Sequence, residues 1–106
     1  MRDDGVMSEL LDSDTVTESL RGLPGWERDG DALVQKVSLP SFPAAISVVD
    51  KVAVLAERAD HHPDIDIRWR NLTFRCSTHS AGGITQLDLD LAAEISEVVK
   101  VAQSEH

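Results

Sequence analysis

Residues 64–77, which read DIDIRWRNLTFRCS, decide the fold of this chain. Apolar and polar residues alternate along the segment, and Asn71 near its middle is a residue type common in tight turns. The alternation predicts two half-buried antiparallel strands that reverse near Asn71, because successive side chains of a strand point to opposite faces. The side chains predicted to face inward are Ile65, Ile67, Trp69, Leu72, Phe74 and Cys76.

A long helix is expected immediately before these strands. Ser41 suits an N-cap, and Pro43 is tolerated in a first turn. The helix should end near Asp60, because His62 precedes a proline and such a residue avoids the helical region. Val48 and Leu55 lie outside the predicted core face, so we expect them to make a second contact, such as one with another subunit. That core face comprises Phe42, Ala45, Ile46, Val49, Val52, Ala53 and Ala56.

Another helix is expected after the two strands. The intervening Ala81-Gly82-Gly83 is predicted to be a flexible link. Thr85 and Asp88 then have the spacing of a capping pair at a helix start. The helix should run to about residue 102, with an apolar face made of Leu91, Ile95, Val98 and Ala102.

The first third of the chain supplies a short helix and a hairpin. Thr15 and Glu18 match a capping box for a helix over residues 16–21. Asp29-Gly30 is a strong two-residue turn signal, which would place Trp26 opposite Leu33 in a hairpin reaching Leu39.

The order of elements is therefore helix, two strands, helix, two strands, helix. Strands joined as hairpins and interleaved with helices predict an α+β fold, a four-stranded antiparallel sheet with helices packed on one face. The predicted divisions of the chain are a flexible leader over residues 1–12, in which Leu10 and Leu11 can dock, one domain over residues 13–102, and a tail over residues 103–106.

Composition narrows the classes of function. The chain has 106 residues, enough for one domain with one core. Nineteen acidic against ten basic residues give a formal net charge of -9, which disfavours direct binding to nucleic acid or to anionic membranes. No apolar segment has the length of a signal sequence or of a membrane span, so we expect a cytoplasmic protein.

The single cysteine, Cys76, lies within an alternating strand pattern. We therefore expect it to pack as a small buried thiol. The alternative, a nucleophilic thiol, would require a histidine partner.

A cluster of histidines and carboxylates surrounds the quoted segment. Three of the four histidines, His61, His62 and His79, fall between Glu57 and Asp88. Histidine titrates closest to neutral pH, so the cluster favours proton transfer. Purely structural interpretations also exist. His61-His62 beside a proline could be a surface turn, and Asp88 alone could be a helix-start residue. The three imidazoles could also bind a metal, but adjacent residues rarely direct both rings at one ion.

The spacing as a whole is more specific. Glu57-x-x-x-His61-His62-Pro63, followed by Trp69, His79 and Asp88, resembles the signature of the pterin-4a-carbinolamine dehydratases at every fixed position. The resemblance extends over about residues 13–102. It includes Leu23-Pro24-Gly25-Trp26, Ser77-Thr78-His79 and Asp88-x-x-Leu91-Ala92.

This resemblance implies a hydro-lyase that converts 4a-hydroxytetrahydropterin to quinonoid dihydropterin in the recycling of tetrahydrobiopterin-type cofactors. It implies catalysis by His61, His62 and His79, with Glu57 and Asp88 as supporting residues and with no metal or cofactor. The residues it implies for substrate binding are Asp60, His61, His62, Trp69, Ser77, Thr78 and His79.

The resemblance also implies a homo-oligomer, either a dimer or a tetramer. In this chain Ile46 and Val48 occupy positions that are often aromatic in the family, so an interface there would bury less area. The competing interpretation is a non-catalytic module on the same fold, which would bind proteins or act as a transcription coregulator.

Overall fold

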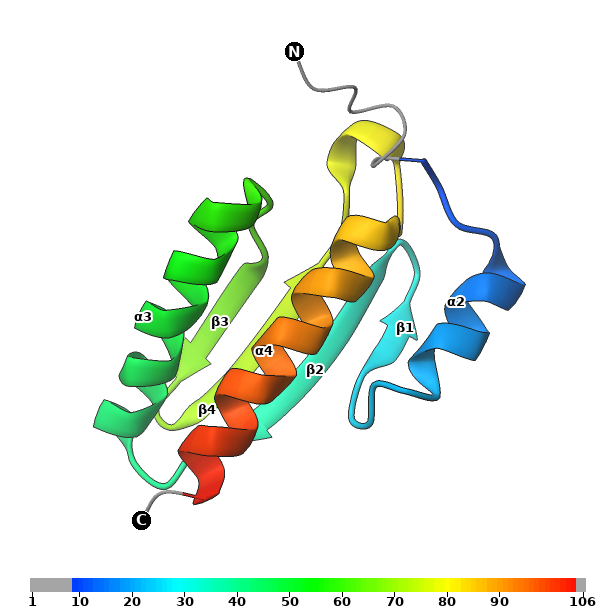
Figure 1. Cartoon of the computed structure of the whole chain (residues 1–106). Coiled ribbons are helices and arrows are strands. Elements are labelled where there is room, and N and C mark those ends of the chain that lie inside the picture. Colours follow the sequence, from blue (N-terminus) through cyan, green and yellow to red (C-terminus); the bar gives the residue numbers. More distant parts are fainter. Residues whose placement is uncertain (1–8, 105–106) are drawn as a thin grey trace.

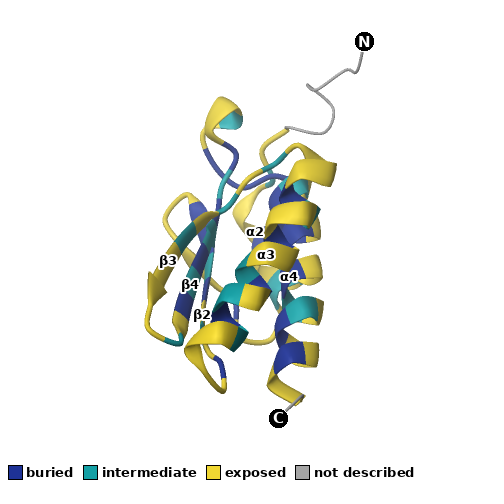
Figure 2. Cartoon of the chain, turned by 90° about the vertical axis from the view of Figure 1, so that its left-hand side faces the viewer, coloured by how far each residue is buried: buried dark blue, intermediate teal, exposed yellow. Residues whose placement is uncertain are grey.

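The computed structural model describes residues 9–104. Four antiparallel strands form one sheet in the order β1-β2-β4-β3, and all three α-helices cover one of its faces (Figures 1 and 2). The predicted α+β fold is confirmed. The strands are β1 Glu27–Asp29, β2 Ala32–Ser38, β3 Asp64–Arg68 and β4 Asn71–Cys76. The helices are α2 Ser13–Leu20, α3 Phe42–Ala59, the 3-10 turn η1 His79–Ala81 and α4 Gln86–Ser104.

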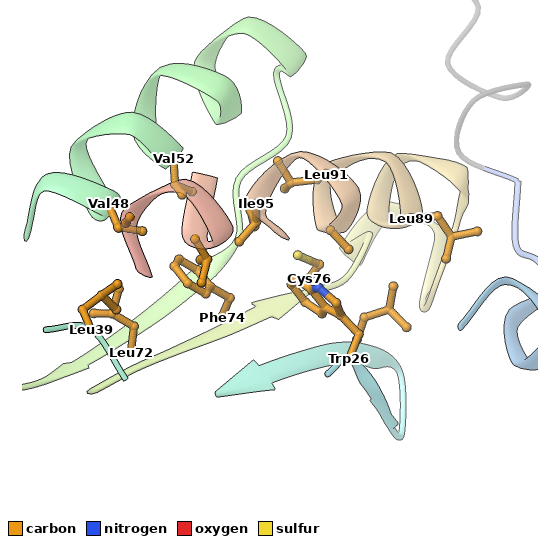
Figure 3. Packing of buried hydrophobic residues seen from close by; sticks show 14 of the residues in the cluster. Trp26, Leu39, Val48, Val52, Leu72, Phe74, Cys76, Leu89, Leu91 and Ile95 are labelled. Atoms are coloured by element: carbon orange, nitrogen blue, oxygen red, sulfur yellow. The ribbon is translucent and has the colours of Figure 1, made fainter. Parts of the chain in front are cut away.

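The core lies between the sheet and the helices. Leu72, Phe74 and Cys76 alternate inward along β4, as the sequence predicts, and each is 1% exposed or less. Figure 3 shows Phe74 between the sheet and the helix residues Val52 and Ile95. The helix α4 therefore packs on the central strands β2 and β4, and it also packs against α3.

The predicted inner face of α3 is partly wrong. Val48, which we expected to make a second contact, is only 1% exposed and belongs to the core. Phe42 and Ala53, which we expected in the core, are exposed. The reason is that α3 packs against α4 as well as over the sheet, so two neighbours set its buried arc, and helical periodicity alone locates only one.

The first hairpin forms, but with a different register. Asp29 pairs with Ala32, so the turn residues are Gly30 and Asp31, and Arg28 lies opposite Leu33 in place of Trp26. Gly30 has a φ of 61°, which a glycine adopts without strain. A shift of two residues keeps each side chain on its predicted face, so Trp26 still enters the core.

The start of α2 also differs from the prediction. The helix begins at Ser13, and its N-cap is Asp12, whose carboxylate accepts from the backbone N of Thr15 at 2.7 Å. This hydrogen bond lowers the pKa of Asp12. The predicted cap, Thr15, therefore lies in the first turn, because a carboxylate three residues earlier reaches the same free N–H groups.

The predicted leader and tail are partly structured where the model describes them. The backbone N of Leu11 donates to the carbonyl of Ile84 at 3.0 Å, so the chain docks on the fold before α2 begins. Residues 1–8 and 105–106 lie outside the described range, whereas Gln103 and Ser104 belong to α4. The division into leader, domain and tail otherwise stays a prediction.

Within residues 9–104, no helix is both long enough and apolar enough to cross a membrane. The cytoplasmic location stays a prediction.

Candidate active site

The end of α3 brings two histidines to the edge of the sheet. Asp60 caps the helix in the left-handed conformation, with a φ of 53°. The backbone N of His61 then donates to the carbonyl of Ala56 at 3.1 Å, a bond that closes the helix end. His61 and His62 follow directly, before β3 begins, as the proline at position 63 predicts.

His61 is joined to a buried carboxylate. Its Nε2 lies 2.6 Å from Oδ1 of Asp88, at the start of α4. The His61 side chain is 10% exposed and that of Asp88 is 0% exposed. Residues that are 27 positions apart in the sequence therefore form one buried pair, and the supporting role expected for Asp88 has a definite geometry.

A network of hydrogen bonds holds Asp88 in place. Its Oδ2 accepts from the hydroxyl of Thr78 at 2.8 Å and from the backbone N of Thr85 at 2.9 Å. The Thr85 hydroxyl accepts from the backbone N of Leu87 at 3.2 Å, which confirms the predicted capping pair. It also lies 2.8 Å from the Thr78 hydroxyl.

The direction of these bonds follows from the donor count. Each hydroxyl has one hydrogen, and that of Thr78 is donated to Asp88. The hydroxyl of Thr85 must therefore donate to Thr78, so the chain of donors ends on the Asp88 carboxylate. As an acceptor, this carboxylate keeps a proton on Nε2 of His61 and thereby selects the tautomer of the ring.

His62 has a contrasting environment. Its Nε2 lies 2.6 Å from Oε2 of Glu57, one turn back along α3. The side chains are 56% and 79% exposed, so this pair lies in solvent. Glu57 therefore orients the His62 ring but contributes little stability, as is usual for exposed pairs.

Among residues 9–104, no side-chain hydrogen bond joins His79 to either of these pairs. It begins η1, is exposed, and lines a depression of about 280 Å³ with Asp31, Asp64, Arg75, Ser77 and Gly82. Its neighbour Thr78 bonds to Asp88, the partner of His61. His61 and His62 therefore lie together after the end of α3, whereas His79 lines the depression with Ser77.

The segment after His79 is not the flexible link that we predicted. The backbone N of Thr78 donates to the carbonyl of Gly83 at 2.8 Å, and that of Gly82 donates to Thr78 at 3.0 Å. Gly82 has a φ of 79°, which permits this tight closure. Two glycines here serve a fixed turn that holds Thr78 and His79 in position.

The sequence predicted that Trp69 lies in the strand β3, but in the structure it does not. It occupies the turn between β3 and β4, has a φ of 59°, and is 67% exposed. The length of β3, about 17 Å at 3.3 Å per residue, separates it from the histidine end of the strand. Within one chain, Trp69 is therefore remote from the histidines with which it was grouped.

A larger hollow of about 430 Å³ lies between α4, β2 and the turn at residues 22–24. None of the predicted site residues lines it. We place the candidate site at the histidines in spite of its smaller depression, because proton transfer requires titratable side chains, and catalytic hydrogen bonds often tighten only in the complex with substrate.

Comparison with known proteins shows the family of this chain. Residues 9–98 match the family model described as pterin 4 alpha carbinolamine dehydratase. The chain belongs to this family. Proteins named pterin-4-alpha-carbinolamine dehydratase from Nocardia farcinica and Roseiflexus castenholzii are 55% and 53% identical to it. These matches cover 90% and 88% of this chain and 100% of each relative.

A solved structure shares the fold. The transcriptional coactivator/pterin dehydratase from Brucella melitensis superposes with a TM-score of 0.82 at 27% identity, over 84% of this chain and 97% of that one. The family and the hydro-lyase class expected from the signature are thereby confirmed.

Sequence reasoning missed the roles of several residues around the site of this pterin dehydratase. Thr85 was expected as a helix cap, but its hydroxyl also orients Thr78 towards Asp88. Asp31, Asp64 and Arg75 line the depression beside His79, and only the folded sheet brings them together. A charged residue on an exposed turn or strand gives no local sign of which other residues it will lie beside in the fold.

Cys76 is expected to be unreactive in the folded dehydratase. It is 0% exposed, and burial, with smaller contributions from the charges of Asp88 and Asp64, raises the pKa of its thiol to about 12. A thiol reagent such as DTNB at pH 8 should therefore modify no cysteine in native protein and one per chain in guanidinium chloride. Rapid labelling of native protein would show that the strand opens or that the thiol is accessible.

Proposed function

We infer that this chain catalyses the dehydration of 4a-hydroxytetrahydropterin to quinonoid dihydropterin, with histidines as general acid and base. The observation that carries the proposal is the buried pair of His61 and Asp88, whose carboxylate also accepts from Thr78 and Thr85. A ring held in one orientation and one tautomer suits proton transfer to a bound substrate. Membership of the dehydratase family supplies the substrate class.

The reaction needs two proton transfers. The bond between C4a and the hydroxyl oxygen breaks, and a proton delivered to that oxygen lets it leave as water. The N5 lone pair forms the C4a=N5 double bond, and N5 loses its proton to a base. An acid and a base at near-neutral pH are therefore sufficient, and each such group typically contributes about 10² to 10⁴ in rate.

The geometry suggests how the roles are divided. We assign His62 to the N5 proton, because its ring is exposed and can exchange that proton with solvent. His61 or His79 would protonate the leaving hydroxyl. Glu57 orients His62, and Asp88 orients His61.

Asp60, Ser77 and His79 remain our candidates for contacts with the pterin. Thr78 acts differently, because it is 4% exposed, its hydroxyl donates to Asp88, and its backbone N donates to Gly83. We therefore assign Thr78 to positioning Asp88. No cofactor is required by these steps, and the role in pterin recycling, the cytoplasmic location and the homo-oligomeric state belong to the same proposal.

The test is the rate at which 4a-hydroxytetrahydropterin disappears, followed by its ultraviolet absorbance after subtraction of the uncatalysed rate. Wild-type protein should accelerate the reaction. The His62→Ala variant should be about a hundredfold slower, at the lower end of the range for a general base, because an exposed ring acts in high dielectric. Its free energy of unfolding should stay within about 0.5 kcal/mol of wild type, as for other surface substitutions.

A folded wild type without any acceleration would contradict the proposal. The competing function would then be a non-catalytic binding module, and the Brucella melitensis protein is named as both a transcriptional coactivator and a pterin dehydratase. The pairing of His61 with the buried carboxylate of Asp88 favours the enzyme, since a binding surface has no need of such a pair.

A further inference from the structure

Residues 9–12 precede α2 and begin beside the loop that leads into α4 (Figure 1). The backbone N of Leu11 donates to the carbonyl of Ile84 in this loop, at 3.0 Å. The Leu11 side chain is half-buried against the hydrophobic core. Leu10 lies over Gly83, because a Cβ built on Gly83 would lie 2.9 Å from a methyl carbon of Leu10. Residues that we expected to form a flexible leader therefore contact the loop beside the histidine site.

One peptide unit of this loop is hydrogen-bonded at both of its polar groups. The carbonyl of Ile84 and the N–H of Thr85 belong to the same planar unit. The unit accepts from Leu11 at its carbonyl, and its N–H donates to Oδ2 of Asp88 at 2.9 Å. Oδ1 of that carboxylate lies 2.6 Å from Nε2 of His61. Hydrogen bonds therefore run without a break from the backbone of Leu11 to the ring of His61.

We propose that the backbone N–H of Leu11 is a positioning group for the histidine site, because it fixes the peptide unit that holds Asp88. This inference rests on the proposed dehydratase function. A planar peptide unit turns as one body about the two Cα atoms that flank it. A hydrogen bond at its carbonyl therefore limits the directions in which its N–H can point. With Leu11 in place, the N–H of Thr85 stays aimed at the carboxylate that orients His61.

The bond from Leu11 also strengthens the next bond in the chain. Hydrogen bonds in series polarise one another, by about 10–30% per bond. An amide whose carbonyl accepts a hydrogen bond is thus a better donor at its N–H. Ile84 and Thr85 are both buried, so water competes little for these groups. The Asp88 carboxylate is therefore held more firmly than it would be by an isolated N–H of Thr85.

Helix α2 fixes the position of Leu11 from the other side. The residue after Leu11 is Asp12, the N-cap of this helix. Val16 in the first turns of α2 is completely buried in the core. The hydroxyl of Ser13 accepts from Nη1 of Arg28 at 3.1 Å. Because α2 is attached to the fold in this way, Leu11 presents its N–H from a fixed position.

The same segment stands behind the turn that carries His79. The carbonyl of Gly83 accepts from the backbone N of Thr78 at 2.8 Å, and Leu10 covers Gly83. Gly83 directly precedes Ile84, so a shift of the Ile84 carbonyl would also loosen the bond to Thr78. Loss of the Leu11 N–H should therefore disturb both branches of the site, the pair of His61 with Asp88 and the turn before His79.

Leu11→Pro and Leu11→Val form a matched pair of variants. Proline and valine are similar in size, but only proline lacks the N–H. Position 11 lies outside α2, so proline there removes no bond within the helix. We expect kcat of Leu11→Pro to be at least about tenfold below that of Leu11→Val, since a misplacement of about 1 Å can cost about 10² in rate. KM should change less, because the chain of bonds ends at His61, which we assign to proton transfer.

Two measurements follow the chain of bonds without an activity assay. The ring N–H that His61 directs at Asp88 is shielded from solvent, so it should give a slowly exchanging signal in ¹⁵N-edited NMR spectra. This signal should move or broaden in Leu11→Pro and persist in Leu11→Val. Hydrogen exchange of the Thr85 amide should become faster in Leu11→Pro than in Leu11→Val, whereas the amides of the central strand β4 should keep their rates. A purely general loss of stability would instead accelerate all of these amides together.

The proposal would be overturned if folded Leu11→Pro matched Leu11→Val in kcat, in the His61 signal and in exchange at Thr85, or if exchange in β4 accelerated as much as at Thr85. If Leu11→Pro does not fold, replacing Leu11 by its α-hydroxy acid removes the N–H but keeps the side chain, and the same results are expected. Inactive wild type would refute the dehydratase function, while the signal and the exchange rates would still decide the role of Leu11.

Discussion

Asp88→Ala is expected to lower the free energy of unfolding by about 3–5 kcal/mol, because three donors lose their acceptor and each unsatisfied buried group costs about 1–3 kcal/mol. The substitution would leave the largely buried ring of His61, the Thr78 hydroxyl and the Thr85 backbone N–H without their acceptor. Urea unfolding followed by circular dichroism measures the change. A small domain has only about 5–15 kcal/mol in total, so the variant should lose a large fraction of its stability.

Asp90→Ala is the control for this variant. Asp90 is exposed on the same helix, and its carboxylate accepts from the side chain of Gln86 at 2.8 Å. Its removal should cost less than about 0.5 kcal/mol. Equal stability of Asp88→Ala and wild type would show that the network is not a structural element.

Asp88→Asn separates the structural role of Asp88 from its effect on the chemistry. The amide oxygen can still accept from Thr78 and Thr85, so the loss of stability should be smaller, about 1–2 kcal/mol. The amide NH₂ would then face Nε2 of His61 and require the other tautomer of the ring. We expect activity to fall by about a hundredfold or more although the protein stays folded.

The sequence predicted those parts of the fold that short-range patterns determine. The alternation over residues 64–77 located both strands of the second hairpin, because a half-buried sheet requires a period of two. Thr85 and Asp88 predicted the start of α4, because the capping geometry is local. Local spacing also predicted that Glu57 lies about one helical turn from His62, and their side chains do meet.

What the sequence missed depends on contacts between distant elements or on small shifts in turns. Val48 became a core residue because α3 meets α4 as well as the sheet. Trp69 left its strand because the reversal came two residues earlier than Asn71 suggested. The positioning role of Thr78 was missed, because the resemblance implied Thr78 only as a substrate contact, and the fold alone places its hydroxyl 2.8 Å from Asp88.

His61→Gln is expected to lower kcat by about 10³-fold or more while the protein stays folded. Glutamine has an N–H that can donate to Asp88, but it neither gives nor takes a proton at neutral pH. The effect should exceed that of His62→Ala, because His61 is 10% exposed against 56% for His62, and electrostatic interactions are stronger in a low dielectric.

His61→Ala completes the comparison. It should lose as much activity as His61→Gln, but it should also be less stable, because the buried Asp88 carboxylate loses a partner. Stopped-flow absorbance with saturating 4a-hydroxytetrahydropterin gives kcat, and urea unfolding gives stability. If His61→Gln kept activity within threefold of wild type, His61 would be a structural residue, and the proton to the leaving hydroxyl would have to come from His79.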